Sequence, residues 1–89
     1  MPYIKPEERK DYDPIINVLL EYLQRVDEKK VDGYINYIFS RILKEIYVVQ
    51  PSYFNYNRCI GVLECAKLEA YRRWVSELED KKIQENGDI

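Results

Sequence analysis

Histidine is absent from this sequence, and cysteine and glycine are scarce. Histidine is the commonest metal ligand and the commonest acid–base group near neutral pH, so its absence removes the usual form of both kinds of site. The chain also lacks a phosphate-binding glycine loop, a nucleophile elbow and a Cys/His metal spacing. The sequence therefore predicts no catalytic residue, no metal ligand and no cofactor.

Two further absences concern the cell compartment and the class of partner. No stretch approaches the roughly 20 apolar residues of a membrane span, and the opening MPYIKPEERKDYDP lacks the apolar segment of a signal peptide. Cys59 and Cys65 would lie roughly 240° apart around one helix, so they cannot form a disulfide. The 14 basic and 16 acidic residues nearly balance, which argues against nucleic acid as a partner. We expect a cytoplasmic protein without membrane contact.

The composition that remains is that of a small helical domain rich in tyrosine. The 89 residues are 46% hydrophobic and include nine tyrosines, a residue that suits half-buried positions. A domain of this length buries only about 60% of the surface that its unfolded chain exposes. Association with a second copy is one common way to stabilise such a chain.

Start and stop signals predict an all-α fold: a single domain over residues 1–89, a small bundle of three or four helices. Asp13, Asp32 and Ser52 each read as an N-cap, with Pro14 at the first position of its helix. Asn86-Gly87 reads as a stop. The predicted parts are an N-terminal arm over 1–12 with a short turn at Pro6, and helices over 14–26, 32–47 and 53–85, the last with a break or bend near 75–78.

The third helix has more apolar surface than one neighbouring layer needs. Its apolar arc spans roughly 240° of the circumference, whereas packing on one layer takes about 100° or somewhat more. The first two helices supply one surface, and a second copy of the chain is the best candidate for the other. The expected dimer surface comprises Gly61, Leu68, Tyr71 and Val75. The alternative is a monomeric three-helix bundle in which this helix lies between the other two.

Two charged residues, Glu64 and Lys67, fall inside that apolar arc and can pair because they are three positions apart. One interpretation is a site, in which a partly buried Glu64 acts as an acid, a base or a cation ligand. The other is a structural polar hub of Glu64, Lys67, Arg41 and Tyr71. The structural interpretation is favoured.

Two other patterns carry weaker hypotheses. Glu77 and Asp80 form an E-x-x-D pair like those that bind magnesium in all-helical pyrophosphohydrolases, but the required second pair is missing. YRRW, from Tyr71 to Trp74, has the composition of a nucleic-acid contact. On a helix, however, its two arginines point away from its two aromatic rings. Neither pattern is favoured.

Several blocks resemble a small uncharacterised family of bacterial and bacteriophage proteins. They are MPYIK, Asn36-Tyr37, Asn57, Gly61–Cys65, Lys67–Glu69, Tyr71–Arg73, Glu79–Ile83 and Glu85–Asp88. The run Val75–Leu78 departs from that family, in which a proline often falls nearby. The resemblance implies a domain of unknown function carried by a prophage, and transfers no site residue.

These observations favour a non-enzymatic interaction or regulatory protein. We expect a homodimer whose tyrosine-rich surface can bind a further protein partner. The alternative hypothesis is a small enzyme or ligand-binding protein that uses Glu64 with tyrosine or arginine neighbours.

Overall fold

The computed structural model describes residues 3–89 and confirms the all-α prediction, because every regular element in that range is helical. None of these helices combines the length and apolarity of a bilayer span. The short helix α1 and two ordinary helices are followed by one long, interrupted C-terminal helix. The elements are α1 (Pro6–Arg9), α2 (Asp13–Gln24), α3 (Glu28–Leu43), the π-helical turn η1 (Lys44–Val48), α4 (Tyr53–Ala70), the π-helical turn η2 (Tyr71–Val75) and α5 (Ser76–Asn86).

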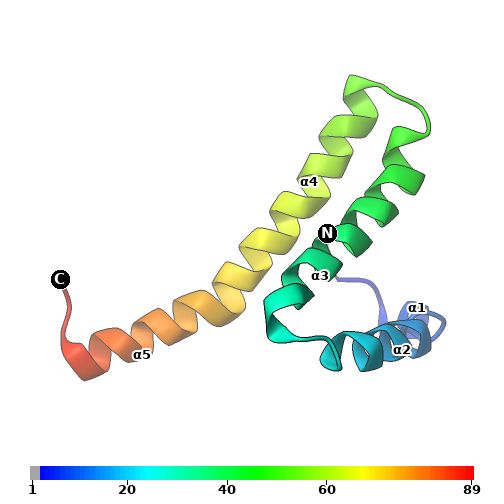
Figure 1. Cartoon of the computed structure of the whole chain (residues 1–89). Helices are drawn as coiled ribbons and strands as arrows, with labels where there is room; N and C mark the ends of the chain where they lie inside the picture. Colours follow the sequence, from blue (N-terminus) through cyan, green and yellow to red (C-terminus); the bar gives the residue numbers. More distant parts are fainter. Residues whose placement is uncertain (1–2) are drawn as a thin grey trace.

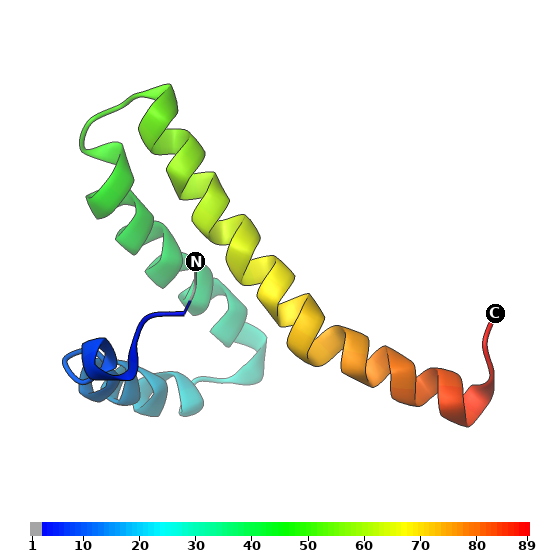
Figure 2. The same cartoon turned by 180° about the vertical axis from the view of Figure 1, so that it is seen from behind.

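The helices form an open arrangement. α3 and α4 run antiparallel beside each other, α1 and α2 lie across one end of that pair, and α5 leads away from it (Figures 1 and 2). The radius of gyration is 16.8 Å, against about 12 Å for a compact chain of this length. The extents of 50 × 34 × 32 Å reflect the projecting α5.

Ser52 starts α4 as predicted. Its backbone is extended, with φ −163° and ψ 156°, and its Oγ accepts a hydrogen bond of 3.0 Å from the amide of Asn55. The Asn55 side chain in turn donates to the carbonyl of Gln50 at 2.8 Å. The Arg58 guanidinium lies 5.3 Å from the ring centre of Tyr47 in η1. These contacts fix the direction in which the chain reverses between α3 and α4.

The predicted N-cap Asp32 is wrong, because the N-cap of α3 lies five residues earlier. Asp27 is the N-cap, and its carboxylate accepts a hydrogen bond of 2.9 Å from the amide of Lys29. Val26 and Val31 flank the start at the positions of a hydrophobic staple, and both are half-buried. The earlier start therefore gains both a cap and an apolar contact position, while Asp32 lies inside the helix.

The predicted N-cap Asp13 is also wrong, by one residue. The backbone at Tyr12 is already right-handed helical, and its carbonyl accepts a hydrogen bond of 2.9 Å from the amide of Ile16. The turn after α1 leads directly into α2, as the hydrogen bond from the amide of Tyr12 to the carbonyl of Arg9 indicates. Because the chain never becomes extended there, Asp13 cannot take the N-cap conformation.

The long C-terminal helix is continuous but changes direction at η2 (Figure 1). The expected interruption over 75–78 therefore lies slightly earlier, at Tyr71–Val75, and takes the form of a π-helical turn, a common cause of helix bends. α5 ends at Asn86. Gly87 follows with φ 87°, a conformation that favours glycine, and its amide donates to the carbonyl of Ile83 at 2.8 Å.

No residue in the described range is fully buried in the single chain. The nearest equivalent of a core is a set of half-buried side chains from α2, α3, α4, the connector after α2 and the two π-helical turns. It comprises Leu19, Leu23, Val26, Val31, Ile35, Ile38, Leu43, Tyr47, Asn55, Cys59, Leu63, Glu69, Ala70 and Val75. The α3–α4 pair is thus covered on its inner side only.

Candidate functional site

The predicted polar hub is only half assembled in the single chain. Lys67 Nζ lies 3.2 Å from Glu64 Oε1, but both side chains are open to solvent, at 60% and 52% exposed. Arg41 instead donates to the hydroxyl of Tyr37 on its own helix at 3.2 Å, and that hydrogen bond raises the pKa of Arg41. The structure therefore joins Glu64 with Lys67 and leaves Arg41 elsewhere.

Most residues of the predicted dimer surface lie on an uncovered part of the long helix. Leu68 and Tyr71 are exposed, and a Cβ added to Gly61 would have no atom within 4 Å. Val75, in the π-helical turn, is half-buried. Three of the four candidates thus stand on a surface that this chain leaves open.

A polar cluster that the sequence reasoning did not identify joins the start of the chain to the end of α4. We call it the N-terminal clasp, made of Tyr3, Glu69, Arg72 and Arg73. The Tyr3 hydroxyl donates to Glu69 Oε1, and Arg72 donates to both of these groups at 2.8 Å. Arg73 Nε completes the set at 3.7 Å from the same carboxylate oxygen. The Glu69 side chain is only 20% exposed.

The clasp stabilises a charged carboxylate. The hydrogen bond from Tyr3 lowers the pKa of Glu69 most, Arg72 and Arg73 lower it further, and partial desolvation acts in the opposite direction. The hydrogen bonds to Glu69 and Tyr3 raise the pKa of Arg72. Glu69 is therefore ionised at neutral pH and acts as a hydrogen-bond acceptor, which is the role of a group that holds a segment in place.

The clasp was missed because its partners are 66 and 69 positions apart, and helical periodicity links only near neighbours. One signal pointed to it. Tyr3 stands in the MPYIK block, while Glu69 and Arg72 stand in the KLE and YRR blocks that carry the family resemblance. Three blocks of one family pattern, the first of them distant in the sequence from the other two, thus meet in space.

The other candidate residues form simple ion pairs or remain free thiols. Glu77 pairs with Lys81 at 3.7 Å on α5. Within residues 3–89, no group of three or more Cys, Asp and Glu side chains is gathered closely enough to hold a metal ion. Arg72 and Arg73 of the YRRW motif both face Glu69. Cys59 is half-buried and Cys65 exposed, and both are free thiols.

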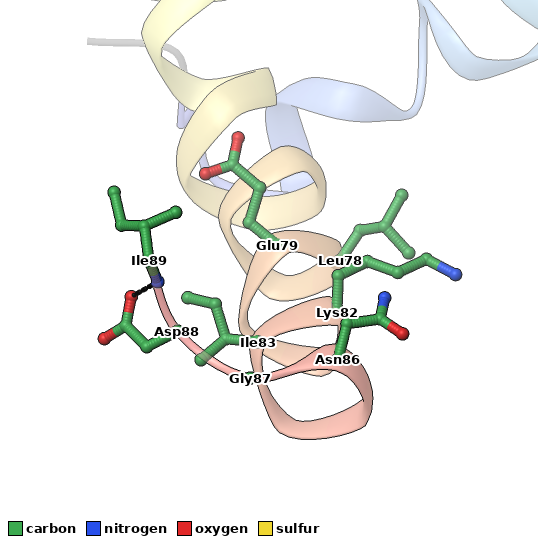
Figure 3. Close-up of a pocket in the computed structure, with 8 residues that line it drawn as sticks. All are labelled: Leu78, Glu79, Lys82, Ile83, Asn86, Gly87, Asp88 and Ile89. Carbon is green, nitrogen blue, oxygen red and sulfur yellow. Dashed lines mark hydrogen bonds between the residues drawn. The ribbon is translucent and has the colours of Figure 1, made fainter.

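The hollows on the surface are mostly apolar. One of about 310 Å³ lies between α2 and α3 and is lined by Leu19, Tyr22, Leu23, Val26, Tyr34, Tyr37 and Ile38. Another, of about 440 Å³, lies where the last residues return beside α5, and Figure 3 shows Ile83 and Ile89 among its lining residues. The hydrogen bond drawn there runs from the Ile89 amide to the side chain of Asp88, at 2.7 Å. Neither hollow presents a convergent set of reactive groups.

Comparison with known proteins gives one match over the whole chain. A family model described as Domain of unknown function (DUF6899) covers residues 1–89. No curated protein and no solved structure matches the chain.

Proposed function

We propose that this chain, which belongs to the DUF6899 family of unknown function, is a non-enzymatic interaction or regulatory protein built as a homodimer. The observation that carries the proposal is the lack of any fully buried residue over 3–89 in the single chain. A folded protein with no interior of its own gains one when a second copy covers its apolar surface.

The exposed area supports this reasoning. The chain exposes 8409 Å², whereas a folded monomer of 10.8 kDa exposes about 5,500 Å². The excess is about 2,900 Å² by that scaling. Obligate dimers bury roughly 2,000–5,000 Å² over both partners, so the excess is more than one such interface requires of each chain.

The position of the apolar area favours a protein partner over a small ligand. Phe39 and Ile42 on α3 are each more than half exposed, as are Leu68 and Trp74 on the long helix. These side chains spread over several helical turns, as in a contact between helices. A ligand pocket would instead enclose its occupant in one cavity.

The non-enzymatic part of the proposal draws support from the polar groups. Glu69, the carboxylate with the most partners, is held in its ionised form by Tyr3 and Arg72. A general acid at neutral pH would need its pKa raised instead. The alternative function, an enzyme or ligand-binding protein using Glu64, gains no support from a carboxylate that is half exposed and paired with Lys67.

Light scattering behind a sizing column tests the proposal. We expect a mass of twice 10.8 kDa at micromolar concentration. Because folding and association are coupled in such a dimer, the melting temperature should rise with protein concentration. A mass of 10.8 kDa together with cooperative melting independent of concentration would overturn the proposal.

The proposal also includes the setting in which such a dimer would act. The family resemblance favours a bacterial or bacteriophage source, and the two free thiols favour the cytoplasm. A tyrosine-rich surface outside the dimer contact would then remain available for a further protein partner. Chemical crosslinking in the source cell, followed by identification of the crosslinked chains, tests that last step.

A further inference from the structure

The most regular uncovered feature of the molecule is a ridge on the outer side of α4. Ile60, Glu64, Lys67 and Tyr71 follow one another at spacings of four, three and four residues. This is the spacing of the a and d positions of a coiled coil, which form the seam between two helices. At 100° per residue the four side chains lie within an arc of about 60°. We call them the outer ridge.

The outer ridge is open along its whole length. Ile60 is 62% exposed and Tyr71 53%, while the Glu64 and Lys67 side chains between them are 52% and 60% exposed. Cys59 and Leu63, which flank the ridge about 110° and 70° round the helix from its centre, are half-buried. The chain thus partly covers one flank of the ridge and leaves the ridge itself uncovered.

The order of residues along the ridge is self-complementary. Read in either direction it runs from a large apolar residue through two opposite charges to another large apolar residue. We propose that two copies of the chain associate through their outer ridges, antiparallel, about a two-fold axis between positions 65 and 66. In that arrangement Ile60 faces the partner's Tyr71, and Glu64 faces the partner's Lys67. This inference rests on the proposed homodimer and assigns its central contact.

Charge decides the orientation of the two helices. In a parallel, in-register pair, Glu64 would face the partner's Glu64 and Lys67 the partner's Lys67, which places like charges in the seam. In the antiparallel pair each carboxylate meets an ammonium group. The pair already present within one chain, at 3.2 Å, then becomes a cluster of four alternating charges. Two charges inside an apolar arc are thereby explained without a catalytic role.

The residues beside the ridge and the bend after it fit the same contact. Gly61 has open space around its missing side chain, which lets a second backbone approach closely. Leu68 is exposed on the same flank as Gly61 and widens the apolar area. The ridge ends at Tyr71, where the π-helical turn begins and α5 departs (Figure 2). The contact is therefore about 16 Å long, from the rise of 1.5 Å per residue.

Charge reversal in separate chains tests the inference. Glu64→Lys gives a ridge with two positive charges, and Lys67→Glu a ridge with two negative charges. Each variant alone should lose most of its dimer at micromolar concentration, because like charges then meet across the axis. An equimolar mixture should regain the dimer as a heterodimer, detected by native mass spectrometry. Neither variant contains the intrachain pair, so the recovery reports only the contact between chains.

The matched control is the ion pair on α5, Glu77 with Lys81, which lies outside the ridge. Glu77→Lys should leave the dimer intact. If the wild type is a dimer and both ridge variants also remain dimers, the ridge inference is overturned while the homodimer proposal stands. If the wild type is a monomer, both fail.

A measurement on the unmodified protein covers the case in which a variant does not fold. A zero-length carbodiimide crosslinker joins carboxylates to amines in direct contact. Applied to a mixture of ¹⁴N- and ¹⁵N-labelled wild-type chains, it should yield a crosslinked peptide of mixed label that contains Glu64 and Lys67. Crosslinked dimers without that mixed-label peptide would overturn the ridge contact.

Discussion

The inner and outer faces of α4 carry similar side chains in different surroundings. Cys59, Leu63 and Ala70 on the inner face are half-buried, while Ile60 and Leu68, at least about 60° further round the helix, are exposed. Apolar character alone therefore does not tell which face is covered within the chain. α4 therefore has apolar surface for two neighbours, of which one chain supplies only one.

Truncating a side chain on the inner face tests whether that face acts as the core of the single chain. Leu63→Ala removes a half-buried side chain of α4. Full burial would make such a change cost 2–5 kcal/mol, and we expect about 2 kcal/mol here, near the lower end. The melting temperature, followed by circular dichroism at one fixed concentration, should fall by roughly 8–16 °C. A fall of less than about 2 °C, well under this scale, would mean that the inner face contributes no core.

The matched change on the outer face should affect association instead of the fold of each chain. Ile60→Ala removes a side chain that is 62% exposed in the single chain. If the outer ridge is the dimer contact, each dimer loses two such groups, at about 1 kcal/mol each. The dissociation constant, measured by analytical ultracentrifugation, should then rise roughly 30-fold by the relation between affinity and free energy. An unchanged constant would place the contact elsewhere.

A change at the start of α4 that touches neither face tests the stability of the helix itself, apart from the packing of its two faces. Ser52→Ala removes the hydroxyl that accepts the hydrogen bond from the amide of Asn55. Loss of such a cap costs about 1 kcal/mol, and Ser52→Gly only a few tenths. Thermal melts of the two variants should therefore show a larger decrease for alanine. Equal decreases would mean that the cap does not stabilise α4.

The cap also illustrates which features a sequence reveals. Ser52 and Gly87 were predictable because each acts through atoms within a few residues. The start of α3 was misplaced although its signal was present, since Val26, Asp27 and Val31 form a staple around a cap and only the later Asp32 was considered. Helix ends depend on contacts within a few residues, so the sequence carries the signal for them. At α3 that signal includes the valines on either side of Asp27 as well as the cap itself.

The parts that the sequence did not reveal depend on long-range geometry. Tyr3 and Glu69 meet only because α4 returns past the start of the chain. The π-helical turn at Tyr71–Val75 contains no proline or glycine to announce it. A helical wheel treats residues 53–85 as one straight helix with one continuous apolar arc. In the structure the bend directs α5 away from α3 (Figure 1). Each of these features requires knowing which segments become neighbours.

The smallest expected effect concerns the flank of α4, where the clasp holds the start of the chain. Glu69 has a lowered pKa in the folded state, so its contribution to stability is present above the unfolded pKa and is lost as the pH falls through the folded pKa. Tyr3→Phe removes the largest cause of that lowering. The pKa of Glu69 should rise toward its ordinary value, and the decline of stability on the acid side should become shallower. Titration of the side-chain carboxyl ¹³C shifts by nuclear magnetic resonance measures this directly.

The same spectra contain their own control in Glu85, which pairs with Lys82 at 3.5 Å on α5, far from the clasp in the sequence. Its carboxyl ¹³C signal should be unaffected by Tyr3→Phe. A Glu69 midpoint that also stays unchanged would mean that the start of the chain does not rest against α4 in solution. The half-burial of Glu69 would then need a different neighbour, and the flank would become a second open side of α4 beside its outer face.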